Sequence, residues 1–224
     1  MRVNESWLGL YSRVDSRRRA VVTVRETEGW WPVSVPDVSV RDGLLSAGKR
    51  LFAELGYDQT TNEMIAEIAG VPVESIAREF GDRRHLYLEV FRQAQAEDEA
   101  LLERFGGMVS DRASYHRFLD AYLDHLDEHP ENAALTVQRW MNDATDFHNV
   151  EADYILPQVD ATGKILDGIF RDEVDSELLI WTLAWTSHLF VLAGIPRHDG
   201  SRSPADQARF RRYLHTLTDL CLKP

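Results

Sequence analysis

Two histidines one helical turn apart, His125 and His129, have a spacing that can bind a metal ion. Imidazoles at positions i and i+4 lie on one helix face, where both can reach the same ion. However, no further ligand converges on the pair in the sequence, and the neighbouring Asp124 and Glu128 are typical of a solvated helix face. We therefore predict neither a metal nor another cofactor here.

Residues arranged for catalysis are missing from the sequence. The segment from Gly43 to Gly48 lies within a helical pattern and is not a phosphate-binding loop, and neither GxSxG nor HExxH occurs. The single cysteine, Cys221, lies near the end of the chain without a local group that would activate its thiol. We predict that the protein is not an enzyme.

Aromatic residues in the C-terminal half form a pattern that suits ligand binding. Trp181, Trp185 and His188 lie at i, i+4 and i+7, so they share one helix face. Further candidate lining residues are Trp140, Met141, Phe147, His148 and Tyr154. Together they could form an apolar pocket with a few polar groups, which suits a small lipophilic or aromatic effector. The alternative is that these rings belong to the core or to a dimer interface.

Helices must position these residues, because no strand alternation follows residue 40. Apolar residues recur at helical spacing from Ser39, and glycines at 56, 70 and 81 separate three short helices from a long fourth one. Five more helices are predicted at about 111–129, 131–146, 148–173, 176–194 and 205–222. Pro157 should kink or break the third of these.

The predicted fold class is therefore all-α. The chain of 224 residues is 44% hydrophobic and 28% charged, as expected for an ordered globular protein. We divide it into an irregular N-terminal extension (1–40), whose β-prone stretches could form a short hairpin or an arm, a three-helix domain (41–92), and a larger helical domain (93–224).

The three-helix domain contains a helix-turn-helix pattern. Ala66, Gly70 and Ile76 lie at offsets 0, +4 and +10. The first must be small because the two helices cross there, the glycine suits a left-handed turn, and the aliphatic residue locks the second helix onto the first. Such a unit presents its second helix to the DNA major groove. A plain helical hairpin is the alternative.

Around this pattern, the sequence resembles the TetR family of transcriptional regulators. The resemblance covers about residues 41–92, and its motifs are Leu51-Phe52 before Gly56-Tyr57, Thr60-Thr61, Ile65-Ala66, Ala69-Gly70-Val71, Phe80 and Leu86. It implies a homodimer that binds operator DNA and is released by a small effector. It also implies that the last two helices (about 176–194 and 205–222) form the dimer interface.

The resemblance also implies which residues face DNA. These are Thr61, Val73, Glu74, Ser75, Arg78 and Arg83. The family often has Ser-Lys or Ser-Arg and then glycine at the start of the recognition helix, whereas this chain has Pro72-Val73 and Glu74. The aromatic phosphate contact that the family often has near the end of that helix is replaced by Ala77 and Arg78.

Charge leaves two functions open. The chain carries 25 basic and 37 acidic residues, and residues 41–92 have a net charge of −2, which is unfavourable for phosphate binding. An arm containing Arg17, Arg18 and Arg19 could compensate in the minor groove, or it could be a solvated stretch. The first hypothesis is a ligand-responsive repressor. The alternative is a protein of the same fold that has lost operator binding and acts as a protein-interaction or ligand-sensing module.

One uncharged segment, from Leu178 to Ile195, is long enough to be considered as a membrane span. It contains Thr182, Thr186, Ser187 and His188, so we interpret it as a helix buried in the protein or at a dimer interface. No secretory signal is recognisable at the N-terminus, and a single cysteine fits a reducing compartment. We therefore expect a cytoplasmic protein.

Overall fold

The computed structural model describes residues 39–195 and 203–224. Of the predicted extension (1–40), only residues 39 and 40 are among the described residues. Arg17, Arg18 and Arg19 lie outside them. The described residues are helical and contain no strand; one isolated antiparallel bridge joins Phe170 to Leu222. The predicted all-α fold is confirmed.

Three short helices open the described chain: α1 (Val40–Leu55), α2 (Asn62–Ala69) and α3 (Glu74–Phe80). Polar side chains before α1 and α2 cap the free backbone N–H groups, as Thr61 does by accepting a hydrogen bond from the N–H of Met64 at 3.2 Å. Gly70 ends α2 in the left-handed conformation, with φ of 67° and ψ of 31°. This turn brings α3 across α2, as the offset pattern predicted.

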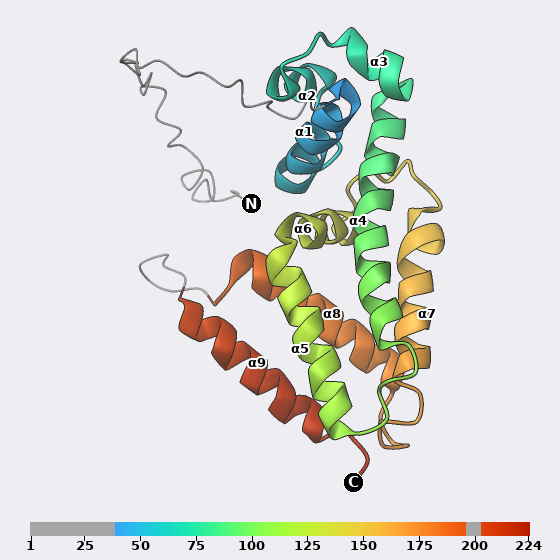
Figure 1. Ribbon diagram of the computed structural model, residues 1–224, viewed down its shortest axis with the longest axis vertical. Coiled ribbons are helices and arrows are strands. Elements are labelled where there is room, and N and C mark those ends of the chain that lie inside the picture. Colours follow the sequence, from blue (N-terminus) through green and yellow to red (C-terminus); the bar gives the residue numbers. More distant parts are fainter. Residues whose placement is uncertain (1–38, 196–202) are drawn as a thin grey trace, which may run out of the picture. The chain divides into compact units, whose positions relative to one another are not determined.

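Helix α4 (Arg83–Phe105) belongs to both parts of the described chain. Figure 1 shows it running from the group formed by α1, α2 and α3 down to the remaining helices. The predicted domain boundary at 92/93 falls in its middle. Buried side chains of α4, among them Leu86, Tyr87, Val90 and Phe91, join a core that also contains Phe52 of α1. The three N-terminal helices and the helices below them are therefore linked by continuous packing.

The C-terminal part contains α5 (Arg112–Glu128), α6 (Pro130–Trp140), the π-helical turn η2 (Glu151–Ile155), α7 (Leu156–Ile165), α8 (Ser176–Ala193) and α9 (Pro204–Asp219). A second core lies between these elements and the end of α4, and it includes Tyr115, Phe118, Leu119, Leu183 and Leu214. Helix α8 packs against α5, α6 and α7 (Figure 1). The structure thus places the C-terminal aromatic residues inside and around a helical bundle.

Three predicted helices are shorter in the structure than the sequence pattern indicated. The helix expected over 131–146 ends at Trp140, because Asn142 and Ala144 adopt φ of 64° and 54°. The helix expected over 148–173 is interrupted by η2 before Pro157 and ends at Ile165. The last helix ends at Asp219, where residues 169–171 hydrogen-bond the chain end instead. Apolar periodicity continues through these turns, which is why it overestimated the helices.

Helix α8 is long and apolar enough to cross a membrane by length and composition. A core helix passes the same test, and α8 buries Ile180, Leu183, Ser187 and His188 within the bundle. Its opposite side leaves Leu178, Trp185 and Leu189 exposed. One such helix among the described residues is weak evidence for a membrane span.

Candidate functional site

The helix-turn-helix unit is held by the residues that the sequence pattern singled out. Ile65 and Ala66 of α2 and Ile76 of α3 are all at most 4% exposed, so they form the contact between the two helices. Val71 and Phe80 pack partly buried against the same core. With these side chains turned inward, the opposite face of α3 is free for another molecule.

The predicted DNA-facing residues differ in their exposure. Thr61 and Glu74 are exposed, and Val73 is half-buried just before α3. Ser75 is fully buried, which corrects the expectation that its hydroxyl faces DNA. Its oxygen instead accepts a hydrogen bond from Nη2 of Arg78 at 3.1 Å. The small hydroxyl at this position therefore orients an arginine within α3.

Arg78 is the exposed basic residue of α3. Its Nε donates to Oε1 of Glu79 at 3.1 Å, and the side chain is 61% exposed. The exposed Glu74 lies one turn earlier on the same helix. The accessible face of α3 consequently carries both acidic and basic side chains, and Arg78 supplies its positive charge.

Two arginines begin α4 beside this unit, and each stacks on an aromatic ring. The guanidinium of Arg83 lies 4.2 Å from the ring centroid of Tyr57, and that of Arg84 lies 4.4 Å from the centroid of Phe147. Cation–π stacking fixes the arginine stems while leaving positive charge at the start of the helix. Arg83 is thus half-buried at the edge of the unit.

A loop after α6 contacts the loop between α1 and α2. The carboxylate of Asp143 accepts hydrogen bonds from the backbone N–H groups of Tyr57 at 2.7 Å and Asp58 at 3.0 Å. Gly56 has φ of 80°, and a Cβ there would lie only 2.9 Å from Oδ1 of Asp143. The glycine is required both for the turn and for the close approach of this carboxylate. We call this contact the Asp143 latch.

Arg139 holds the latch loop in place. It is 7% exposed, its guanidinium donates to the carbonyl oxygens of Asp143, Ala144 and Phe147, and it pairs with Glu151 of η2. A buried arginine needs this number of partners because an unpaired buried charge is strongly unfavourable. The guanidinium therefore connects α6, η2 and the loop that reaches the helix-turn-helix unit.

The bundle below contains a largely apolar cavity of about 120 Å³, lined by residues of α4, α5, α6, η2, α7 and α8. Three of the eight predicted ligand-binding residues line it: Trp140, Trp181 and His188. The ring of Trp140 lies 6.2 Å from that of Trp181 and 4.9 Å from that of His188 between centroids. The structure therefore brings together one part of the predicted pocket.

The other five predicted lining residues lie outside the cavity. Met141 and His148 are exposed on the loop after α6, and Phe147 is buried against Tyr57 and Tyr87 above the cavity. Tyr154 packs on Phe91 and borders a separate groove between α4 and α7. Trp185 is 44% exposed and stacks on Trp181. Helical spacing predicted which of these residues share a helix face, but it did not predict which face lines the cavity.

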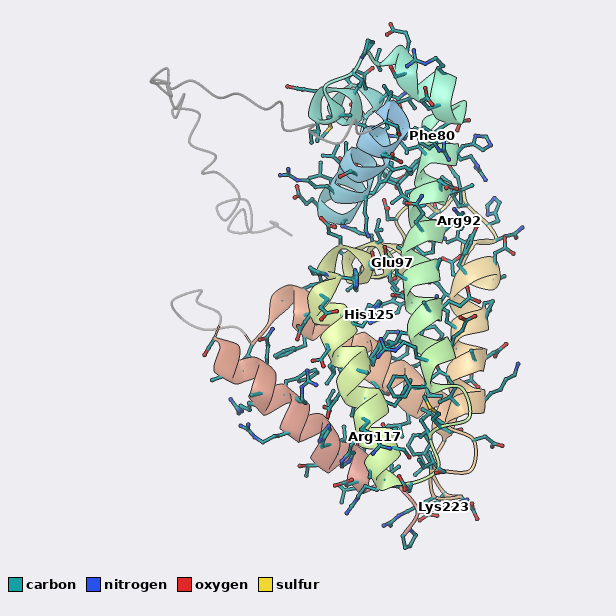
Figure 2. All side chains as sticks on the ribbon, in the orientation of Figure 1. Phe80, Arg92, Glu97, Arg117, His125 and Lys223 are labelled. Carbon is teal, nitrogen blue, oxygen red and sulfur yellow. The ribbon has the colours of Figure 1, made fainter. Side chains whose placement is uncertain are left out.

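Sequence reasoning missed most polar residues of the cavity. Gln95 and Asp98 come from α4, and Tyr122 and His125 come from α5. Nε2 of His125 lies 2.7 Å from Oδ1 of Asp98 (Figure 2 labels His125 on the side of α5 that faces α4). The sequence signal was the pair His125 and His129, interpreted as a solvated face. His125 instead reaches inward, while His129 lies 3.5 Å from Oε2 of Glu97.

Burial keeps two ionisable side chains of the cavity wall, His188 and Tyr122, uncharged. Desolvation lowers the pKa of His188 and raises the pKa of Tyr122, so both are neutral near neutral pH. Nδ1 of His188 lies 2.8 Å from the carbonyl oxygen of Ala184 and 3.2 Å from the hydroxyl of Tyr122. The lining contains neither lysine nor arginine, and Asp98 is its one acidic residue. Across the described residues, no group of three metal-ligating side chains occurs.

Comparison with known proteins concerns the helix-turn-helix unit and the fold. Residues 44–90 match the family model described as bacterial regulatory proteins, tetR family. No curated protein has a matching sequence. The family match covers α1, α2, α3 and the start of α4, where the sequence resemblance had been found.

Solved structures extend the similarity to most of the chain. A ketosteroid transcriptional regulator, KstR2 of Mycobacterium tuberculosis, is 19% identical with a TM-score of 0.61, over 83% of this chain and 96% of that one. A transcriptional regulator (TerR/AcrR family) from Aquifex aeolicus VF5 is 17% identical with a TM-score of 0.61, over 80% and 99%. The fatty acid degradation regulator FadR from Bacillus halodurans is 16% identical with a TM-score of 0.60, over 85% and 96%. At these identities the similarity shows the fold.

Proposed function

We propose that this chain, which belongs to the tetR family of bacterial regulatory proteins by its helix-turn-helix domain and its fold, is a cytoplasmic transcriptional repressor released from operator DNA by a small effector. The observation that carries the proposal is the geometry of α2 and α3. Ile65, Ala66 and Ile76 are buried between the helices, Gly70 makes the left-handed turn, and the outer face of α3 stays accessible.

DNA affinity in this proposal comes from a few cations. Arg78 lies on the accessible face of α3, and Arg83 and Arg84 begin α4, where the helix N-terminus also favours phosphate. The carboxylate of Glu74 would accept a hydrogen bond from the N4 amino group of a cytosine. Since the unit is acidic overall, binding should be weak in high salt.

A homodimer would cover the exposed apolar face of α8. Leu178, Trp185 and Leu189 recur at i, i+7 and i+11, so they lie on one side of the helix. On helix α9, the side chain of Tyr213 is exposed to a similar extent, at 61%. Two copies packed through α8 and α9 would remove this surface from water and pair two recognition helices for a two-fold symmetric operator.

The cavity would take the effector, and the latch loop would carry the response. Trp140 lines the cavity and is the last residue of α6, three positions before Asp143. A ligand that displaces Trp140 would therefore move the loop whose carboxylate holds the backbone between α1 and α2. Effector and DNA would then favour different positions of the same loop, which is a coupling between two sites.

A second candidate function follows from the acidic surface of α3. Glu74 is exposed and Arg78 pairs with Glu79, so less positive charge faces outward than operator binding usually needs. A protein of this fold that senses a ligand and binds another protein through α3 would have this surface. It differs from the first proposal in requiring no DNA.

Electrophoretic mobility of DNA from upstream of the protein's own gene, titrated over salt, tests the proposal. Wild type, Arg78→Ala and the control Arg92→Ala are compared; Arg92 is an exposed arginine in the middle of α4 (Figure 2). We expect selective binding that weakens with salt and that Arg78→Ala reduces, with a salt slope smaller by about one if Arg78 meets a phosphate. Equal binding by both variants, or none at low salt, would favour the second candidate.

A further inference from the structure

We propose that helix α7 is a strap that bows away from α4 and admits the effector into the cavity. The inference rests on the proposed function only in taking the cavity as the effector site, and it goes beyond that function by assigning the entrance. It is carried by the size of the cavity, by the groove between α4 and α7, and by the packing of α7 itself.

The cavity is too small for a ring compound unless one of its walls moves. It measures about 120 Å³, whereas an apolar protein cavity of about 150 Å³ holds benzene. The groove between α4 and α7 is larger, at about 480 Å³. An effector with one or more rings therefore has to displace a wall, and the wall that faces this groove has space on its other side.

The cavity and the groove share one layer of side chains. Gln95 and Leu102 of α4 and Gln158 of α7 line both of them. Nε2 of Gln158 donates to the backbone carbonyl oxygen of Gln95 at 3.0 Å. Within the described part of the chain, this is the one side-chain hydrogen bond that joins α7 to another helix. Opening the shared layer thus breaks a single hydrogen bond.

Helix α7 is the wall that is least firmly packed. None of the side chains of α7 (Leu156–Ile165) is fully buried, whereas α4, α5, α6 and α8 each bury several. Its two ends are anchored instead, because Ile155 before the helix and Leu166 after it are buried in the two cores. Figure 1 shows α7 alongside α4 at the edge of the described helices. Since segments with few buried apolar side chains open at the lowest free energy, α7 can bow outward while its ends stay in place.

A reversible cross-link between α4 and α7 tests the proposal without DNA. Cysteines replace Ala96 of α4 and Ala161 of α7, which both line the groove, in a Cys221→Ser background, and a bifunctional methanethiosulfonate joins them. The probe is N-phenyl-1-naphthylamine, an uncharged compound larger than benzene that fluoresces in apolar surroundings. We expect the cross-linked chain to bind it at least roughly tenfold more slowly, and a reductant that cleaves the link to restore the rate.

Two substitutions on α8 locate the bound probe. Ala184 lines the cavity, so Ala184→Leu should fill part of it and abolish binding. Thr182 is exposed on the same helix and does not line the cavity, so Thr182→Leu should keep the wild-type affinity. Wild-type binding by Ala184→Leu would mean that the probe does not enter the cavity, and it would overturn the proposal.

A substitution of Gln158 tests the hydrogen bond that closes the passage. Gln158→Ala removes the bond to α4 and should speed probe binding roughly fivefold, as the loss of one hydrogen bond from the closed state predicts. The matched control is Gln93→Ala, because the bond of Gln93 to Glu89 stays within α4. The proposal is wrong if the cross-linked chain binds as fast as the cleaved one, if Gln158→Ala binds no faster than the control, or if wild type binds no probe at its solubility limit. Since no DNA is present, loss of operator binding would not produce these results.

Discussion

Replacing Asp143 with asparagine should weaken the contact between the latch loop and the helix-turn-helix unit. In the wild type, one carboxylate accepts from the N–H groups of Tyr57 and Asp58 at 2.7 and 3.0 Å. Asparagine keeps the shape but has a single acceptor oxygen, so its NH₂ group must face one of the two donors. Hydrogen bonds to charged groups contribute about 1.5–3 kcal/mol each, so we expect the free energy of unfolding to fall by about that amount.

Urea unfolding followed by circular dichroism measures the effect. With a denaturant slope of about 2–3 kcal/mol per molar, the midpoint should move down by about 0.5–1.5 M. Asp146→Asn is the matched control, because Asp146 is exposed in the same loop and its replacement removes the same charge. If both variants unfold at the same urea concentration, the carboxylate of Asp143 does not hold the two parts together, and the proposed route from cavity to DNA is refuted.

Three further changes have expected outcomes. Gly70→Ala should lower the free energy of unfolding by about 1–2 kcal/mol in a urea titration. Gly70 has φ of 67° and open space around it, so the added Cβ causes backbone strain and no clash. An unchanged free energy of unfolding would contradict the left-handed turn at this residue. Burial lowers the pKa of His188, so the unfolded chain takes up a proton first as pH falls; stability should be complete above about pH 6.5 and decline below it by up to about 1.4 kcal/mol per pH unit. His188→Asn should flatten that decline in urea titrations from about pH 7.5 to pH 5.5, and an unchanged slope would exclude His188 as its source. Leu189→Glu on the exposed face of α8 should give a monomer in analytical ultracentrifugation, whereas the exposed Glu103→Gln on α4 should remain a dimer; a dimeric Leu189→Glu would place the interface elsewhere.

The fold could be predicted from the sequence because its signals are local. Gly70 and Ile76 identify the helix-turn-helix unit through spacing alone, and both perform the expected structural role. The ends of later helices were less predictable. Asn142 and Ala144 adopt positive φ because Arg139 gathers the carbonyl oxygens of their loop, and that contact arises only in the folded chain.

The candidate site was predictable only where one helix face enters the cavity. Trp181 and His188 share that face, but Trp185, one turn from Trp181, points outward. Gln95 and Asp98 gave no signal, since a polar residue in a charged stretch of α4 resembles a solvated one until α5 and α7 cover it. The inward position of Ser75 likewise depends on how α3 packs, which its neighbours in sequence do not determine.

The central claim is that this chain recognises a DNA sequence, and selection from a random double-stranded library tests it most directly. The purified full chain is bound to the library at low salt, and the retained DNA is sequenced over several rounds. We predict enrichment of an inverted repeat whose half-sites lie about one helical turn apart, 34–36 Å, as two recognition helices in a dimer require. A library that stays unenriched with folded, dimeric protein would contradict the claim.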